Sequence, residues 1–126
     1  MYANYESRSV RSAAILTTSY VAGTVIADIK NNNQLVLLVD FTKGSLTTAE
    51  IKIEVSDDGT NYYQEASTGN ITAGVDSVAS LERQISATGT YEILRPIKAA
   101  YVRVSAKGTG TATGSSMAIK ALIGQV

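Results

Sequence analysis

Side chains able to bind an ion or a ligand are densest between Glu54 and Gln64, in the stretch EVSDDGTNYYQ. Asp57 and Asp58 suggest a calcium loop, because calcium is held by carboxylate and carbonyl oxygens. An EF-hand-type loop, however, places its ligands at alternate positions and closes with a glutamate well downstream. Here the aspartates are adjacent and Glu65 is too near. Asp58-Gly59 instead predicts a tight hairpin turn, since both residues tolerate positive φ.

Two adjacent tyrosines, Tyr62 and Tyr63, follow this turn. Alternation along a strand would send one ring to the core and the other outward. The outward ring could stack on a sugar or contact a partner protein, or it could only pack against a neighbouring strand. Tyr101 is a further candidate for a sugar platform. The chain has no tryptophan, which weakens the carbohydrate interpretation.

The residue types that most often carry catalysis are missing. The sequence has no histidine and no cysteine, so the commonest general base, the commonest transition-metal ligand and the thiol nucleophile are absent. Neither a GxSxG nor a Ser-x-x-Lys pattern occurs, and Gly108-Thr109-Gly110 lacks the lysine of a phosphate loop. We therefore expect a protein that is not an enzyme and that holds no cofactor and no metal.

Charge and hydropathy narrow the partners. The 11 basic and 11 acidic residues give a formal net charge of zero, whereas a nucleic-acid-binding protein usually carries a basic excess. The first twenty residues lack the apolar centre of a signal peptide. The longest apolar run, Leu35 to Val39, has the length of a strand and is too short to span a membrane. We expect no nucleic acid, no membrane, and synthesis in a host cytoplasm.

The elements that position these residues are expected to be β-strands. Apolar and polar residues alternate over Glu50–Val55, Tyr101–Ala106 and Met117–Ile123, as in half-buried strands. Ile15–Tyr20 and Thr24–Ile29 are weaker candidates. The stretch VDSVASLERQI, residues 75–85, fits both helical and strand spacing, and we assign it to a strand from its context.

The strand predicted at Gln34–Phe41 is apolar on both faces. Such a strand lies centrally and is covered twice, with the second cover supplied by an overlying loop or by another subunit. Turn residues separate the runs, at 31–33, 43–45, 58–59, 68–70, 88–90 and 108–110, and Pro96 fits a strand boundary. With 126 residues, enough for one core, this pattern predicts an antiparallel β-sandwich.

The first twelve residues differ from the rest. Tyr2, Tyr5, Arg8 and Arg11 are interleaved with small polar residues and show no apolar period. We expect an extended N-terminal arm over residues 1–12 and a single sandwich domain over 13–126. The arm could be a frayed terminus, or it could contact a neighbouring chain, because tyrosine and arginine are favoured at interfaces.

Three segments taken together resemble the jelly-roll-like β-sandwich proteins of tailed bacteriophage particles, above all capsid decoration or cement proteins. They read LTTSYVAGTVIADIKNNNQLVLLVDFT, EIKIEVSDDGTNYYQ and AAYVRVSAKGTGTATGSSMAIKAL. The second is similar to a Ser-x-Asp-Gly-Thr-x-aromatic hairpin, which also occurs in carbohydrate-binding sandwiches and is often completed there by tryptophan. The third resembles a closing hairpin in which a Gly/Thr-rich turn joins the last two strands.

The resemblance implies an adhesive role without chemistry. Cement proteins sit on the outside of the phage head, often as homotrimers, and span neighbouring major capsid subunits. The residues predicted to contact partners are Tyr2, Tyr5, Arg8, Arg11, Tyr62 and Tyr63. Two alternatives remain: a carbohydrate-binding module of a tail fibre or an enzyme, and another head or tail component of a phage.

Overall fold

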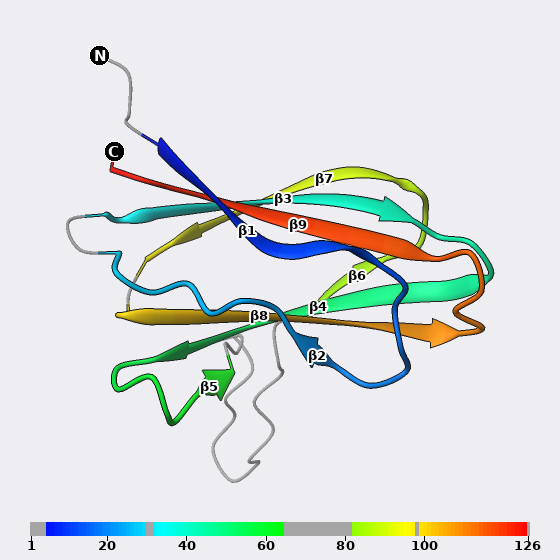
Figure 1. The fold of residues 1–126 in the computed structure, drawn as a ribbon, viewed down its shortest axis with the longest axis horizontal. Coiled ribbons are helices and arrows are strands. Elements are labelled where there is room, and N and C mark those ends of the chain that lie inside the picture. Colours follow the sequence, from blue (N-terminus) through cyan, green and yellow to red (C-terminus); the bar gives the residue numbers. More distant parts are fainter. Residues whose placement is uncertain (1–4, 30–31, 65–81, 98, 126) are drawn as a thin grey trace, which may run out of the picture.

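The fold consists of two antiparallel sheets packed face to face (Figure 1). A computed structural model describes residues 5–29, 32–64, 82–97 and 99–125. One sheet contains, in spatial order, β1 (Tyr5–Ala14), β9 (Ser116–Gly124), β3 (Gln34–Thr42) and β7 (Gly89–Pro96). The other contains β2 (Val21–Ala22), β8 (Tyr101–Gly110), β4 (Leu46–Ser56) and β5 (Tyr63–Gln64), with β6 (Glu82–Ile85) also paired to β4. The prediction of an all-β antiparallel sandwich is confirmed.

The strand order is that of a jelly roll, as predicted. The chain passes from one sheet to the other at every connection except those from β4 to β5 and from β5 to β6. As a result the last strand, β9, lies between β1 and β3, and β8 lies between β2 and β4. This exchange of strands between two sheets is the arrangement of double Greek-key sandwiches.

The core is built by alternate residues of the four longest central strands. Because successive side chains of a strand point to opposite faces, each strand contributes every second residue to the space between the sheets. These inward residues form one continuous buried cluster and include Leu35, Leu37, Val39 and Phe41 of β3, Ile51 and Ile53 of β4, Val102 and Val104 of β8, and Met117, Ile119 and Ile123 of β9.

Residues 5–12 do not form an arm outside the sandwich, because they make up most of β1. This strand pairs along β9 from Tyr5 opposite Gly124 to Ala14 opposite Met117. Val10 is its one buried side chain, so an apolar period is missing although the main chain pairs with β9 over most of its length, with irregularities between Ser9 and Arg11 and between Arg11 and Ala14. The sandwich therefore extends over residues predicted to lie outside it, and residues 1–4 are outside the described part.

Five smaller differences from the sequence prediction concern four connections and one strand. Residues 15–20 form no strand, and segment 24–29 contributes a single bridge between Ile26 and Val102. Gly108-Thr109-Gly110 belongs to the end of β8, and the turn to β9 lies at residues 111–115. The loop from β4 to β5 spans residues 57–62, so it is longer than a two-residue turn. Strand β7 was not assigned a range, although Pro96 was expected at a strand boundary and is the last residue of this strand.

Two predicted features fall largely or wholly outside the described residues: the turn at 68–70 and most of the strand at 75–85, of which 82–85 are seen as β6. The described part of the chain holds no helix with the length and apolar character needed to cross a bilayer.

Candidate contact surfaces

The loop that carries Asp57 and Asp58 is closed by its own hydrogen bonds. The Asp58 carboxylate accepts bonds from the backbone N–H groups of Thr60 and Asn61, both at 2.8 Å, and from the Asn61 side-chain amide at 2.9 Å. The Ser56 hydroxyl donates to Asp58 and accepts from the Gly59 N–H, each at 2.9 Å. Of the predicted pair, Gly59 alone adopts positive φ, at 78°. The Asp58 side chain thus serves as the acceptor of a local turn.

Asp58 should make the stability of the fold depend on pH. The hydrogen bonds from Asn61 and Thr60 hold the pKa of Asp58 well below its usual value of 3.8. A carboxylate whose pKa is lower in the folded than in the unfolded chain stabilises the fold above its unfolded pKa. That contribution is lost as the pH falls toward the folded pKa. We expect the free energy of unfolding to fall between about pH 5 and pH 3, and to fall less in Asp58→Asn. Urea unfolding of both proteins across this range checks the difference, and parallel profiles would contradict it.

The two tyrosines after the loop occupy different environments, and neither enters the core. Tyr62 is half-buried, with the guanidinium of Arg103 lying 4.0 Å from its ring centroid, a cation–π contact. Tyr63 pairs with Val55 at the end of the sheet and remains 65% exposed. Of the two candidate rings, Tyr63 is the one that offers a face to solvent.

The outer face of the β2–β8–β4 sheet carries an internally paired set of charges. Glu54 is only 8% exposed, and Arg103 on the neighbouring strand donates two hydrogen bonds to its carboxylate, at 2.9 and 3.2 Å. The Nζ atom of Lys52, which lies on β4 like Glu54, is 3.9 Å from the Glu54 carboxylate. The hydrogen bonds to Glu54 raise the pKa of Arg103. A carboxylate held by a bidentate guanidinium is a structural ion pair, and its charge is already satisfied.

Glu50, also 8% exposed, is satisfied by hydroxyl groups on the same face. Thr48 and Thr109 donate to its carboxylate at 2.9 and 3.0 Å. Further along, two ammonium groups lie near the Tyr20 ring, those of Lys52 at 4.5 Å and Lys107 at 4.8 Å from its centroid. These polar side chains therefore form their hydrogen bonds, ion pairs and cation–π contacts with one another.

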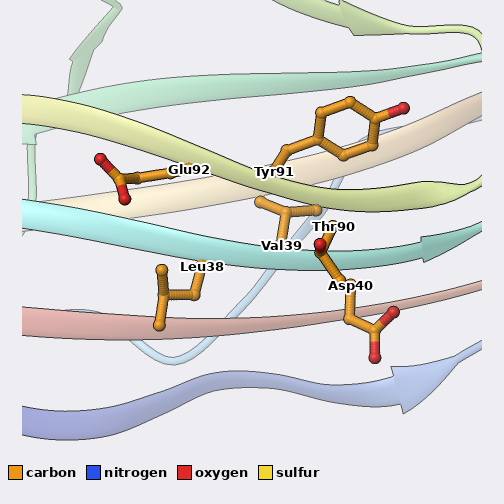
Figure 2. A pocket seen from close by; sticks show the side chains of 6 residues that line it. All are labelled: Leu38, Val39, Asp40, Thr90, Tyr91 and Glu92. Atoms are coloured by element: carbon orange, nitrogen blue, oxygen red, sulfur yellow. The ribbon is translucent and has the colours of Figure 1, made fainter.

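The outer face of the other sheet is different, because apolar residues are left open on it. We call the outward side chains of β9, β3 and β7 the β3 face. On it Leu38 and Leu94 remain 37% and 57% exposed. A hollow of about 380 Å³ lies beside Leu38 over β3 and β7, and its polar border is made by Asp40, Thr90 and Glu92 (Figure 2). The second cover expected for the strand at Gln34–Phe41 is thus not complete within the described chain.

The candidates of the predicted arm lie on β1. Tyr5 pairs with Gly124 at the corner of the β3 face and is about half exposed. Arg8 points the other way and donates to the carbonyls of Ala27 and Asp28 and to the Glu6 carboxylate. Tyr2 is outside the described residues.

Arg11 also bonds within the chain, donating to the backbone carbonyls of Met117, Ala14 and Ile15. Arg8 and Arg11 therefore fasten β1 and the segments around it. A contact with a partner remains a prediction for both.

The comparisons with known proteins find likeness in structure alone. No family model matches the sequence, and a search of curated proteins gives no match. The crystal structure of the SPBc2 prophage-derived protein YomS is similar to this chain, with a TM-score of 0.52 at 18% identity. The match covers 98% of this chain and 96% of YomS. At this identity the two proteins share a fold.

A second similar structure is the K3 cleaved adhesin domain of Lys-gingipain from Porphyromonas gingivalis. It has a TM-score of 0.44 at 12% identity, over 94% of this chain and 74% of that domain.

The hollow and its charged border were missed from the sequence, although one signal for them was present. The two apolar faces of Gln34–Phe41 indicated a second contact on this strand. The border could not be seen, because Glu92 and Thr90 come from β7, and their register beside Leu38 and Asp40 is set by long-range pairing.

Proposed function

We propose that this chain is a non-enzymatic structural protein of a phage particle, and that it binds the outer surface of the head as a decoration protein. In this role it would be made in the host cytoplasm, assemble as a homo-oligomer, a trimer by analogy with cement proteins, and bridge neighbouring major capsid subunits. The observation that supports the proposal best is the shared jelly-roll sandwich with a prophage-derived protein over nearly the full length of both chains.

The distribution of polar groups also supports a binding role. The carboxylates of Glu50, Glu54 and Asp58 serve as acceptors for hydroxyl, guanidinium and amide groups of the fold itself. The β3 face, in contrast, leaves leucine side chains exposed, and exposed apolar residues gathered on one face are typical of surfaces that contact other molecules.

A direct test is to add the purified chain to phage heads prepared without it. We expect saturable co-sedimentation with heads, density on the outer capsid surface by cryo-electron microscopy, and a higher temperature of head disruption. Absence of binding to heads, or density confined to the tail or baseplate, would contradict a decoration role; density in the tail would favour another virion component.

The second candidate function, carbohydrate binding, is favoured by one observation, the exposed ring of Tyr63. Aromatic faces stack on sugars, and this ring is free of the cation–π contact that occupies Tyr62. A glycan array with the wild type and Tyr63→Ala tests it. Binding that is lost in the variant would support a carbohydrate module, and an array without any bound glycan would remove it.

A further inference from the structure

The pairing register arranges the β3 face in rows that cross the strands. Residues directly opposite one another in antiparallel strands share a face, so each outward residue of β3 has one neighbour from β9 and one from β7. The central rows are Leu122–Val36–Leu94 and Lys120–Leu38–Glu92. The first row is apolar throughout, and the second has an apolar centre between opposite charges.

The two charges of the second row have no partners of their own among the described residues. Strands of a sheet lie about 4.8 Å apart, so Lys120 and Glu92 are separated by roughly 10 Å across Leu38. Neither forms an ion pair or a side-chain hydrogen bond within the described part of the chain. Each can therefore pair with a charge on another molecule. Lys120 on β9 requires a negative charge, and Glu92 on β7 requires a positive one.

A second copy of the chain meets this requirement. A two-fold axis that runs parallel to β3, between two facing sheets, preserves the strand direction and exchanges the two sides of β3. It places Lys120 opposite the partner's Glu92, and Glu92 opposite the partner's Lys120. The same operation sets Leu122 against the partner's Leu94 and Leu38 against its own copy. Both rows are thus self-complementary about one axis, as an isologous interface demands.

The hollow on this face fits the side chain that the partner would bring to it. It lies on the β7 side of Leu38, where the two-fold operation delivers the partner's Lys120. Its polar border includes the Asp40 and Glu92 carboxylates, and Leu38 offers an apolar surface to a lysine stem. Asp40 lies one row further along β3, where the same operation sets it opposite its own copy. The partner's lysine beside it would offset part of that repulsion.

We propose that the β3 face binds a second copy of this chain through the two-fold arrangement just described. The inference does not rest on the proposed function, and it replaces the trimer, suggested there by analogy, with a dimer. Sheets packed in this way lie about 10 Å apart and are rotated by about 30°, which confines the contact to the central rows. The β3 face is three strands wide, roughly 10–15 Å across and about 30 Å long, so it offers less area than the roughly 800 Å² per partner of a standard interface. The dimer should therefore be weak and depend on concentration.

Sedimentation equilibrium of the isolated chain tests the inference. For the wild type we expect the average mass to rise with concentration from 13.3 kDa toward twice that value. Leu94→Ser should remain at the monomer mass. Ile15→Ser is the matched control, because Ile15 is 55% exposed and lies outside this face, and it should associate like the wild type. Circular dichroism confirms that each variant is folded.

Charge reversal separates this arrangement from any other association. Lys120→Glu and Glu92→Lys should each weaken the dimer at least about tenfold, because like charges then face each other at two places. The double variant should return to within about threefold of the wild type. A wild type that is monomeric at every concentration, a trimer, an association that survives Leu94→Ser, or a double variant no stronger than the single ones would overturn the inference. None of these results involves phage heads, so failure here and failure of the proposed function are distinguishable.

Discussion

Replacement of Phe41 by alanine should lower the free energy of unfolding by about 3–5 kcal/mol. Phe41 is the one phenylalanine of the chain and is almost completely buried. It lies on the central strand β3, opposite Met117 on β9 and Gly89 on β7. Gly89 contributes no side chain of its own, so the residue of β7 directly opposite Phe41 cannot fill the space that the ring leaves. A domain of this size has a total stability of about 5–15 kcal/mol, so the loss is a large share of it.

Urea unfolding followed by circular dichroism measures this effect. Phe41→Leu retains most of the buried volume and should cost about 1 kcal/mol. Thr42→Ala, at the next and exposed position of the strand, should stay within about 0.5 kcal/mol of the wild type. If Phe41→Ala unfolded like Thr42→Ala, the ring would not be part of the packed core.

Substitution of Gly44 by alanine should lower the free energy of unfolding by about 2–4 kcal/mol, although the position is exposed in a turn. Its φ of +57° disfavours any side chain, at about 1–2 kcal/mol. In addition, a Cβ atom would lie 2.4 Å from the carbonyl carbon of Gly114 and 2.5 Å from the carbonyl oxygen of Thr113. These are main-chain atoms of the turn before β9, which also accepts a hydrogen bond from the Ser45 N–H. The two turns would have to separate.

Gly114→Ala is a matched control for this prediction. Gly114 also has positive φ, +74°, but a Cβ atom there would meet only the Gly44 Cα at an ordinary 3.6 Å. This variant should therefore lose only the backbone contribution of about 1–2 kcal/mol, and the difference between the two variants measures the contact of the turns. Equal losses in urea unfolding would show that the turns do not touch.

The strands that could be predicted are those with a buried face and a solvated face. Alternation identified β4, β8 and β9, and the two-sided apolar run identified β3 as central, because burial of alternate residues follows directly from strand geometry. Strand β1 was taken for an arm since its inner positions hold Glu6, Arg8 and Arg11. An edge strand held by main-chain bonds and by guanidinium contacts to carbonyls leaves no apolar period in the sequence.

The candidate surfaces could be predicted only in part, for a related reason. The apolar residues on both faces of β3 could be recognised from the sequence of that strand alone. The rows that give the β3 face its charge pattern require the register between β3 and two strands far along the chain, which begin at Gly89 and Ser116. Likewise the Ser56–Asn61 loop was predicted as a turn from Asp58-Gly59, but its length depends on side-chain-to-backbone bonds that composition alone does not specify.

The placement of the final strands in the middle of both sheets has a consequence for synthesis on the ribosome. The chain's early strands are neighbours of β8 and β9, and β1 has β9 as its pairing partner. Until the residues up to Gly124 have been translated and have left the exit tunnel, the nascent chain lacks β9, the strand that pairs with both β1 and β3. Folding should then occur late and in one step, so that incomplete chains stay open to chaperones and proteases and do not accumulate as compact fragments.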